Sequence, residues 1–117
     1  MVQRLDRLPA GTRKILVFVP RHHLYPAPGS VGAAMMNECK RRVVEIARQR
    51  PNVEVYDASL PGPVTMEEDR WWDAVHARPD TMARVSRSLA RALQGDESED
   101  VRILTPSPSQ PRSASNQ

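Results

Sequence analysis

The stretch Lys14-Ile15-Leu16-Val17-Phe18-Val19-Pro20 decides the fold that this sequence predicts. Apolar residues, several of them β-branched, fill every position between the lysine and the closing proline. A strand with one exposed face would alternate apolar and polar residues, whereas a continuous apolar run is typical of a strand covered on both faces. We therefore expect a buried strand of a parallel sheet here.

The residues that follow this run predict a βαβ unit. Residues 21–30 contain two prolines and a glycine, which indicates a loop. From Val31 to about Gln49, apolar residues recur at three- and four-residue spacing, which predicts a helix with Ser30 as its N-cap. Residues 52–57 then predict a second short strand. A strand, a helix and a strand within about 45 residues are typical of a βαβ unit.

The apolar stripe of the expected helix includes Met35, Met36 and Cys39. We expect these three side chains in the core and Lys40 on the outer face of the helix. No neighbouring feature would activate the Cys39 thiol, so it is no nucleophile candidate. A single cysteine also excludes an internal disulfide and a cysteine-based zinc cluster.

The second half of the chain predicts a loop and one more helix. Residues 58–78 are expected to be a long loop, and the helix begins at Pro79 and stops at Gly95. We divide the chain into a polar lead-in (1–12), an α/β domain (13–95) and a tail (96–117). The tail is acidic and then rich in proline and serine, so we expect disorder apart from a short strand at residues 101–104.

Length, charge and hydropathy exclude several classes of protein. The 117 residues are enough for one small domain, and no apolar run is long enough to span a membrane. The N-terminus lacks the apolar run of a secretory signal, so we expect a cytoplasmic location. Residues 1–50 hold ten basic and three acidic side chains, and residues 51–100 hold five and eleven. These charges are scattered without interleaved aromatics, so we expect no nucleic-acid partner.

Asp73 and His76 form an Asp-x-x-His sequence in the loop before the last helix. On one tight turn, the carboxylate can fix the imidazole tautomer while the other ring nitrogen faces a hydroxyl nucleophile. The loop lies at the carboxyl side of the expected sheet, where α/β proteins place their sites. The spacing alone more often means a structural role, in which Asp73 accepts loop amides and His76 caps the helix.

Histidine and tryptophan pairs flank this sequence. His22 and His23, with His76, Asp57 and Asp73, could form a zinc or iron site. Adjacent histidines in such a loop more often line a surface or a cleft, and we expect no metal and no cofactor.

The tryptophans Trp71 and Trp72 precede Asp73 directly. We expect Trp72 to be buried in the core, and we expect Trp71 to stack on a sugar or an acyl chain.

Three segments together resemble the C-terminal part of SGNH/GDSL-type hydrolases, most closely a bacterial group. They are KILVFVPRHHLYP (14–26), ECKRRVVEIARQRPNVEVYDAS (38–59) and RWWDAVHARPDTMARVSRSLARAL (70–93). The last block of that group is a hydrophobic-Tyr/Trp-Asp-x-x-His-Tyr/Phe-Arg-Pro motif followed by a helix. The resemblance covers residues 14–94, and the motif is moderately specific.

The resemblance implies a flavodoxin-like α/β/α sandwich, here a partial one with parallel strands in the order β-α-β-loop-α. It implies ester hydrolysis or O-acyl transfer through a serine, with Asp73 and His76 as catalytic residues. The loop after the first strand flanks the cleft in that family, so His22, His23 and Tyr25 are expected to contact an ester or O-acylated substrate.

The chain also departs from the family. It lacks the Gly-Asp-Ser block that carries the nucleophile and the Gly-x-Asn-Asp block that supplies oxyanion donors. Neither Ser30 nor Ser59 matches the position of the family's serine, and Ala77 replaces the aromatic residue after the histidine. We therefore expect the C-terminal portion of an esterase or O-acyltransferase, inactive alone and completed by an N-terminal segment or a separate chain. The alternative is a non-catalytic interaction module whose sheet edges pair in a homo-oligomer.

Overall fold

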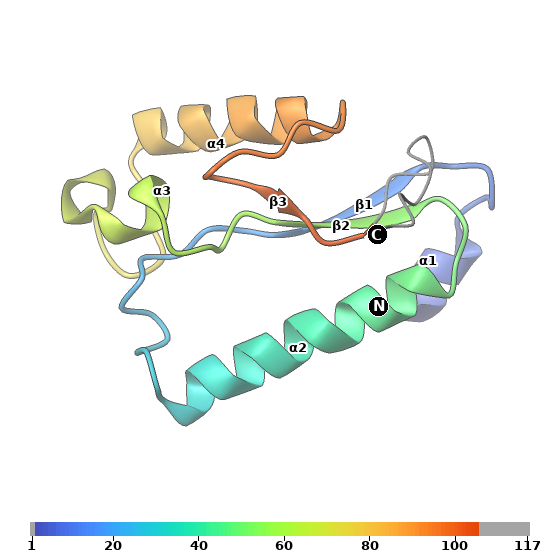
Figure 1. Ribbon diagram of the computed structural model, residues 1–117, viewed down its shortest axis with the longest axis horizontal. Coiled ribbons are helices and arrows are strands. Elements are labelled where there is room, and N and C mark those ends of the chain that lie inside the picture. Colours follow the sequence, from blue (N-terminus) through green and yellow to red (C-terminus); the bar gives the residue numbers. More distant parts are fainter. Residues whose placement is uncertain (1, 106–117) are drawn as a thin grey trace, which may run out of the picture.

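A three-stranded sheet with strand order β1–β2–β3 forms the centre of the computed structural model, which describes residues 2–105 (Figure 1). Strands β1 (Lys14–Phe18) and β2 (Val53–Asp57) are parallel, and Leu16 pairs with Val55. Strand β3 (Arg102–Ile103) runs antiparallel to β2. The expected parallel pair is confirmed, and β3 adds an antiparallel strand to it.

Strand β2 is the buried strand of the sheet. Val53 and Val55 pack in a cluster with residues of α2 (Val31–Arg48). Tyr56 packs in a second cluster with residues of α4 (Pro79–Ala92). Figure 1 shows α2 and α4 on opposite faces of the sheet. The protein is therefore a mixed α/β structure in which β2 is covered on both faces, while β1 lies at an edge.

The two long helices begin and end close to the expected residues. The Ser30 hydroxyl accepts a hydrogen bond from the Ala33 amide at 3.1 Å, which caps α2 as predicted. Helix α4 begins at Pro79, and Gly95 follows its end with a φ of +92°, a left-handed conformation that glycine adopts without strain. None of the helices within residues 2–105 has both the length and the apolar character needed to cross a membrane.

Three short helices form in segments that were expected to be irregular. Helix α1 (Val2–Arg7) lies in the predicted lead-in, and its Leu5 is buried in the cluster beneath α2. Helix α3 (Pro63–Met66) and the 3₁₀ helix η1 (Glu68–Arg70) interrupt the predicted loop. Each is too short to show a helical period in the sequence. Helices α1 and α3 bury Leu5 and Val64 in the two core clusters, whereas η1 buries no residue.

The tail is ordered as far as residue 105, so the expectation of disorder from residue 96 is wrong for this part. Val101 is fully buried, and the Thr105 hydroxyl accepts a hydrogen bond from the Val55 amide at 3.0 Å. Arg84 on α4 pairs with Asp100 at 2.8 Å. The expected short strand is confirmed by β3. Residues 106–117, the rest of the predicted disordered tail, lie outside the described residues.

Helix α2 is much longer than the strands it covers. Its 18 residues extend over about 27 Å, whereas the five residues of β1 extend over about 16 Å. The N-terminal half of α2 therefore projects past the strand ends (Figure 1). Met35 is 67% exposed and Cys39 is exposed, so the prediction that these residues belong to the core is wrong. Within residues 2–105, no strand lies beneath this part of the helix to bury them.

Candidate functional site

Residues 70–78 form a short hairpin that presents Asp73 and His76. The Arg78 amide donates to the Arg70 carbonyl at 3.0 Å, and the Trp72 amide donates to the His76 carbonyl at 2.8 Å. An isolated antiparallel bridge joins Trp71 to Ala77 between these two bonds. The turn of the hairpin is therefore the segment 73–75.

The Asp73 carboxylate organises this turn. Its Oδ1 accepts hydrogen bonds from the backbone amides of Val75, at 2.9 Å, and His76, at 2.8 Å. Its Oδ2 lies 2.7 Å from Nδ1 of the His76 imidazole. The Val75 amide, then the His76 side chain and the His76 amide, lower the pKa of Asp73 below its ordinary value. The carboxylate is thus held in its charged form by three donors.

This geometry selects one tautomer of His76. A charged carboxylate only accepts hydrogen bonds, so the proton of a neutral His76 ring is on Nδ1 and the lone pair is on Nε2. The side chains of His76 and Asp73 are 69% and 55% exposed. Nε2 is therefore placed to take a proton from a group that approaches from outside this loop.

Both roles that the spacing allowed for Asp73 occur together. Asp73 accepts loop amides, as in the structural interpretation, and it also orients His76, as in the catalytic one. His76 does not cap the following helix, because the N-cap residue of α4 is Arg78. The structural interpretation thus explains one oxygen of Asp73 and leaves the imidazole contact unexplained.

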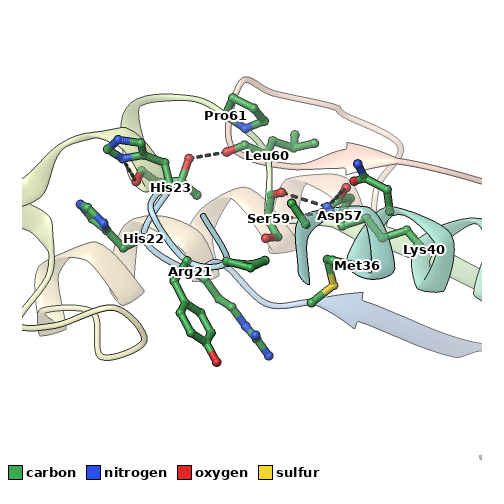
Figure 2. Close-up of a pocket in the computed structure, with 14 residues that line it drawn as sticks. Arg21, His22, His23, Met36, Lys40, Asp57, Ser59, Leu60 and Pro61 are labelled. Atoms are coloured by element: carbon green, nitrogen blue, oxygen red, sulfur yellow. Dashed lines mark hydrogen bonds and ion pairs between the residues drawn. The ribbon is translucent and has the colours of Figure 1, made fainter. Parts of the chain in front are cut away.

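A pocket of about 360 Å³ lies at the carboxyl ends of β1 and β2 (Figure 2). The overhanging half of α2 forms one wall, and the loops that follow the two strands form the others. Its lining residues are Arg21, His22, His23, Tyr25, Pro26, Ala33, Met36, Asn37, Lys40, Asp57, Ser59, Leu60, Pro61 and Thr65. The crevice beyond the carboxyl ends of parallel strands is the usual ligand site of open α/β sheets.

Lys40, Asp57 and Ser59 form the polar end of this pocket. Lys40 Nζ lies 2.8 Å from Asp57 Oδ2 and donates to the Ser59 carbonyl at 3.0 Å. Asp57 Oδ1 accepts the Ser59 amide at 2.8 Å. The Lys40 side chain is 17% exposed, so the prediction that it lies on the outer face of α2 is wrong.

Sequence reasoning named Asp57 only as a possible metal ligand, weighed Ser59 only as a nucleophile and placed Lys40 on the outer face, so it did not predict this cluster. A signal for Lys40 was present, since Met36, Lys40, Val43 and Ala47 follow one another at three- and four-residue spacing and share the sheet-facing side of the helix. Asp57, the acidic residue at the end of the second strand, was the residue with which Lys40 could be expected to pair.

Three of the four predicted substrate-contacting residues line the pocket, namely His22, His23 and Tyr25. The His23 amide donates to the Thr65 carbonyl at 2.8 Å. His22 is only 9% exposed, and its ring centroid lies 4.6 Å from that of His23. Figure 2 shows both imidazoles on the opposite side of the pocket from Lys40.

The fourth predicted residue, Trp71, is not part of the pocket, and the assignment of the two tryptophans is reversed. Trp71 is 6% exposed in the cluster beneath α4, and its indole N–H donates to the Val64 carbonyl at 2.8 Å. Trp72 is 64% exposed. Neighbouring residues of an extended hairpin arm point to opposite sides, so only one of the two can enter the core.

One backbone hydrogen bond joins the pocket to the Asp73–His76 pair. The His22 amide donates to the carbonyl of Ala74, in the turn, at 3.1 Å. The fold thus brings the loop after β1, which carries His22, next to the turn that carries Asp73 and His76. Within residues 2–105, no cluster of three or more His, Cys, Asp or Glu side chains is arranged to hold a metal ion.

Comparison of this chain with protein-family models, with curated proteins and with solved structures found no match.

Proposed function

We propose that this chain is the C-terminal portion of an SGNH-type serine esterase or O-acyltransferase and supplies the base and its orienting carboxylate. The observation that carries the proposal is the 2.7 Å contact between Asp73 Oδ2 and His76 Nδ1, which leaves Nε2 directed away from the pair. The finer fold assignment, a partial flavodoxin-like sandwich, belongs to the same proposal and is supported by helices on both faces of the parallel pair.

The chemistry requires a serine beside His76, and within residues 2–105 no serine forms a hydrogen bond with the His76 ring. In the proposed reaction, Nε2 takes the proton of a serine hydroxyl as that oxygen attacks the ester carbonyl. The imidazolium, stabilised by Asp73, then gives the proton to the leaving alcohol, and water or an acceptor alcohol releases the acyl group.

The serines of the described part with assigned hydrogen bonds have other roles. Ser30 caps α2, and the Ser88 hydroxyl donates to the buried Asp100 at 2.9 Å. The nucleophile and the oxyanion donors are therefore proposed to come from another segment or a separate chain.

The edge of β1 is the place where such a segment would join. Within residues 2–105, no strand pairs with the outer edge of β1. Val17 and Val19 are 37% and 59% exposed, although the run that contains them has the composition of a strand covered on both faces. An added strand would satisfy the unpaired backbone groups of β1 and cover these side chains.

The first test is hydrolysis of p-nitrophenyl acetate by the purified chain, with genomic DNA upstream of the codon for Met1 read in all frames. We expect equal, near-background rates for the chain and for its His76→Ala variant, because no serine of residues 2–105 is placed for His76 to deprotonate. We also expect the upstream DNA to encode a Gly-Asp-Ser block and a Gly-x-Asn-Asp block. Rapid turnover that survives His76→Ala would contradict the proposal. Upstream DNA without either block would exclude an upstream segment as the source of the serine.

A second candidate, an interaction module that pairs with a second copy of itself, is favoured by the exposed flank of α2. Val44 and Arg48 lie beside Leu104, next to β3. Met35 and Cys39 are on the opposite flank of the helix and therefore on the side of β1. The open strand edge and this apolar flank thus lie on one side of the molecule.

Analytical ultracentrifugation decides on this second candidate. A module of this kind sediments as a dimer, and Val17→Arg at the strand edge would convert it to a monomer. The control Met82→Arg, at an exposed position of α4, would leave the dimer intact. A compact monomer at high concentration would contradict this candidate.

A further inference from the structure

The charges of the pocket at the carboxyl ends of β1 and β2 do not cancel. Its lining contains two permanent cations, Arg21 and Lys40, and one acid, Asp57. Both oxygens of Asp57 are engaged, one by Lys40 and the other by the Ser59 amide. Arg21 makes no ion pair within residues 2–105, and its guanidinium carbon lies 5.5 Å from the centroid of the Tyr25 ring. One positive charge at the pocket therefore has no counter-charge.

Hydrogen-bond donors at the pocket are also in excess. Lys40 has three N–H groups and uses two of them, on Asp57 and on the Ser59 carbonyl. His22 is 9% exposed, its ring packs beside those of His23 and Trp71, and it makes no hydrogen bond to another residue within 2–105. A buried imidazole without a partner loses the hydrogen bonds that water would give it, so an acceptor in the pocket would stabilise it.

Apolar side chains form one wall of the pocket, beside the polar Asn37 and Thr65. Met36 and Ala33 contribute from α2, and Leu60, Pro61 and Pro26 contribute from the loops. A volume of about 360 Å³ is at the small end of the range for ligand sites. The pocket thus combines a cationic, donor-rich rim with an apolar wall, which suits a short carbon chain that ends in an anionic group.

We propose that this pocket binds the carboxylate of a short-chain organic acid. If the function proposed above holds, on which this part of the inference rests, the bound group is the anionic end of the ester or O-acylated substrate. The hydrogen bond from the His22 amide to the Ala74 carbonyl places this pocket against the turn that carries Asp73 and His76. Binding itself requires no serine, so it can be measured on this chain.

The experiment is a ¹H–¹⁵N NMR titration of the chain with butyrate, with its neutral analogue butyramide and with inorganic phosphate. We expect butyrate to shift the signals of residues 21–25 and 57–60, and we expect butyramide to leave them unchanged. No shift with butyrate, or equal shifts with butyramide, would overturn the proposal. Phosphate binding as tight as butyrate binding would overturn the carboxylate assignment, because the apolar wall would then contribute nothing.

A matched pair of variants locates the binding site. Arg21→Met should weaken butyrate binding at least about tenfold, since it removes a charged hydrogen-bond donor to the carboxylate. Arg87→Met removes an exposed arginine of α4, outside the pocket, and should leave the affinity unchanged. Equal affinities for the two variants would overturn the assignment, and the dispersion of the same spectra reports whether each variant is folded.

The two proposals fail separately. If the chain binds butyrate but the completed protein has no serine-dependent esterase activity, the proposed function is wrong and the carboxylate pocket stands. If the completed protein has esterase activity but butyrate does not bind at residues 21–25, the carboxylate pocket is wrong and the proposed function stands.

Discussion

Asp73 uses its two oxygens for different purposes, and this division explains why a short exposed turn can hold a defined imidazole. The oxygen that accepts two backbone amides fixes the turn, and the other oxygen is thereby positioned for His76. Asparagine at this position could still accept the amides but could present its NH₂ group to the ring, which would favour the other tautomer. The base and its orienting group thus depend on a carboxylate, and a side chain of similar shape cannot replace it.

Glu54 shows how a charge is tolerated on the central strand. It is 1% exposed, and its carboxylate contacts Arg13 at 2.6 and 3.0 Å and accepts the Tyr56 hydroxyl at 2.9 Å. The Arg13 hydrogen bonds lower the pKa of Glu54 below 4.5 and outweigh the burial that would raise it. Burial, followed by the Glu54 carboxylate, raises the pKa of Tyr56 to about 12.

The depressed pKa of Glu54 predicts the direction of a pH effect. Because the folded-state pKa lies below the unfolded value, the stabilisation is complete above about pH 4.5 and is lost as the pH falls through the folded-state pKa. We expect the free energy of unfolding in urea to decrease below that pH, and we expect Glu54→Gln to be less stable at pH 7 but less sensitive to acid. If the free energies of unfolding of the unmodified protein and of Glu54→Gln changed with pH in parallel, this role of Glu54 would be contradicted.

The identities of the buried residues were the hardest to predict at this scale. Nothing in the sequence distinguishes Trp71 from Trp72, because each arm of the hairpin is too short to show an alternating pattern. The choice depends on the Val64 carbonyl in α3, to which the Trp71 indole donates. Lys40 was misplaced because a lysine is normally counted as polar, whereas its long side chain reaches Asp57 from within the apolar stripe.

The hairpin of residues 70–78 is the element that positions the proposed base, and Trp71 anchors it to the core. We expect Trp71→Ala to lower the free energy of unfolding by about 3–5 kcal/mol, because it removes a large buried side chain and leaves the Val64 carbonyl without its donor. Trp72→Ala should change it by less than about 0.5 kcal/mol, since that ring is mostly exposed. Urea unfolding measures both, and similar losses in the two variants would contradict the anchoring role.

The long elements were predictable from the sequence, and the short ones were not. Helices α2 and α4 have apolar stripes, a Ser30 cap and a Pro79 start, so their bounds follow from local chemistry. Helices α1 and α3 have fewer than two turns each and depend on what they contact. The overhang of α2 was not among the expectations, although it follows from the difference in length between this helix and the strands beneath it.

At the scale of the whole molecule, the two edges of the sheet differ. Within residues 2–105, β3 pairs with β2 at one edge, and no strand pairs with β1 at the other. Residues 101–105 cover β2 at one edge, whereas the apolar strand β1 and the exposed flank of α2 lie together at the other. The sequence predicted a strand covered on both faces, and that description fits β2 better than β1. The candidate site is at the carboxyl end of the same parallel pair, so a segment that extends the sheet past β1 would also lie close to the pocket.

The most direct measurement is the hydrolysis of p-nitrophenyl acetate by this chain joined to the segment that carries the Gly-Asp-Ser and Gly-x-Asn-Asp blocks. We predict clear turnover, reduced at least about 10³-fold by His76→Ala and by Asp73→Asn and unchanged by the control Asp80→Asn, in the first turn of α4. Turnover that is indifferent to His76→Ala in a correctly folded joined protein would contradict the assignment of Asp73 and His76 as the catalytic pair.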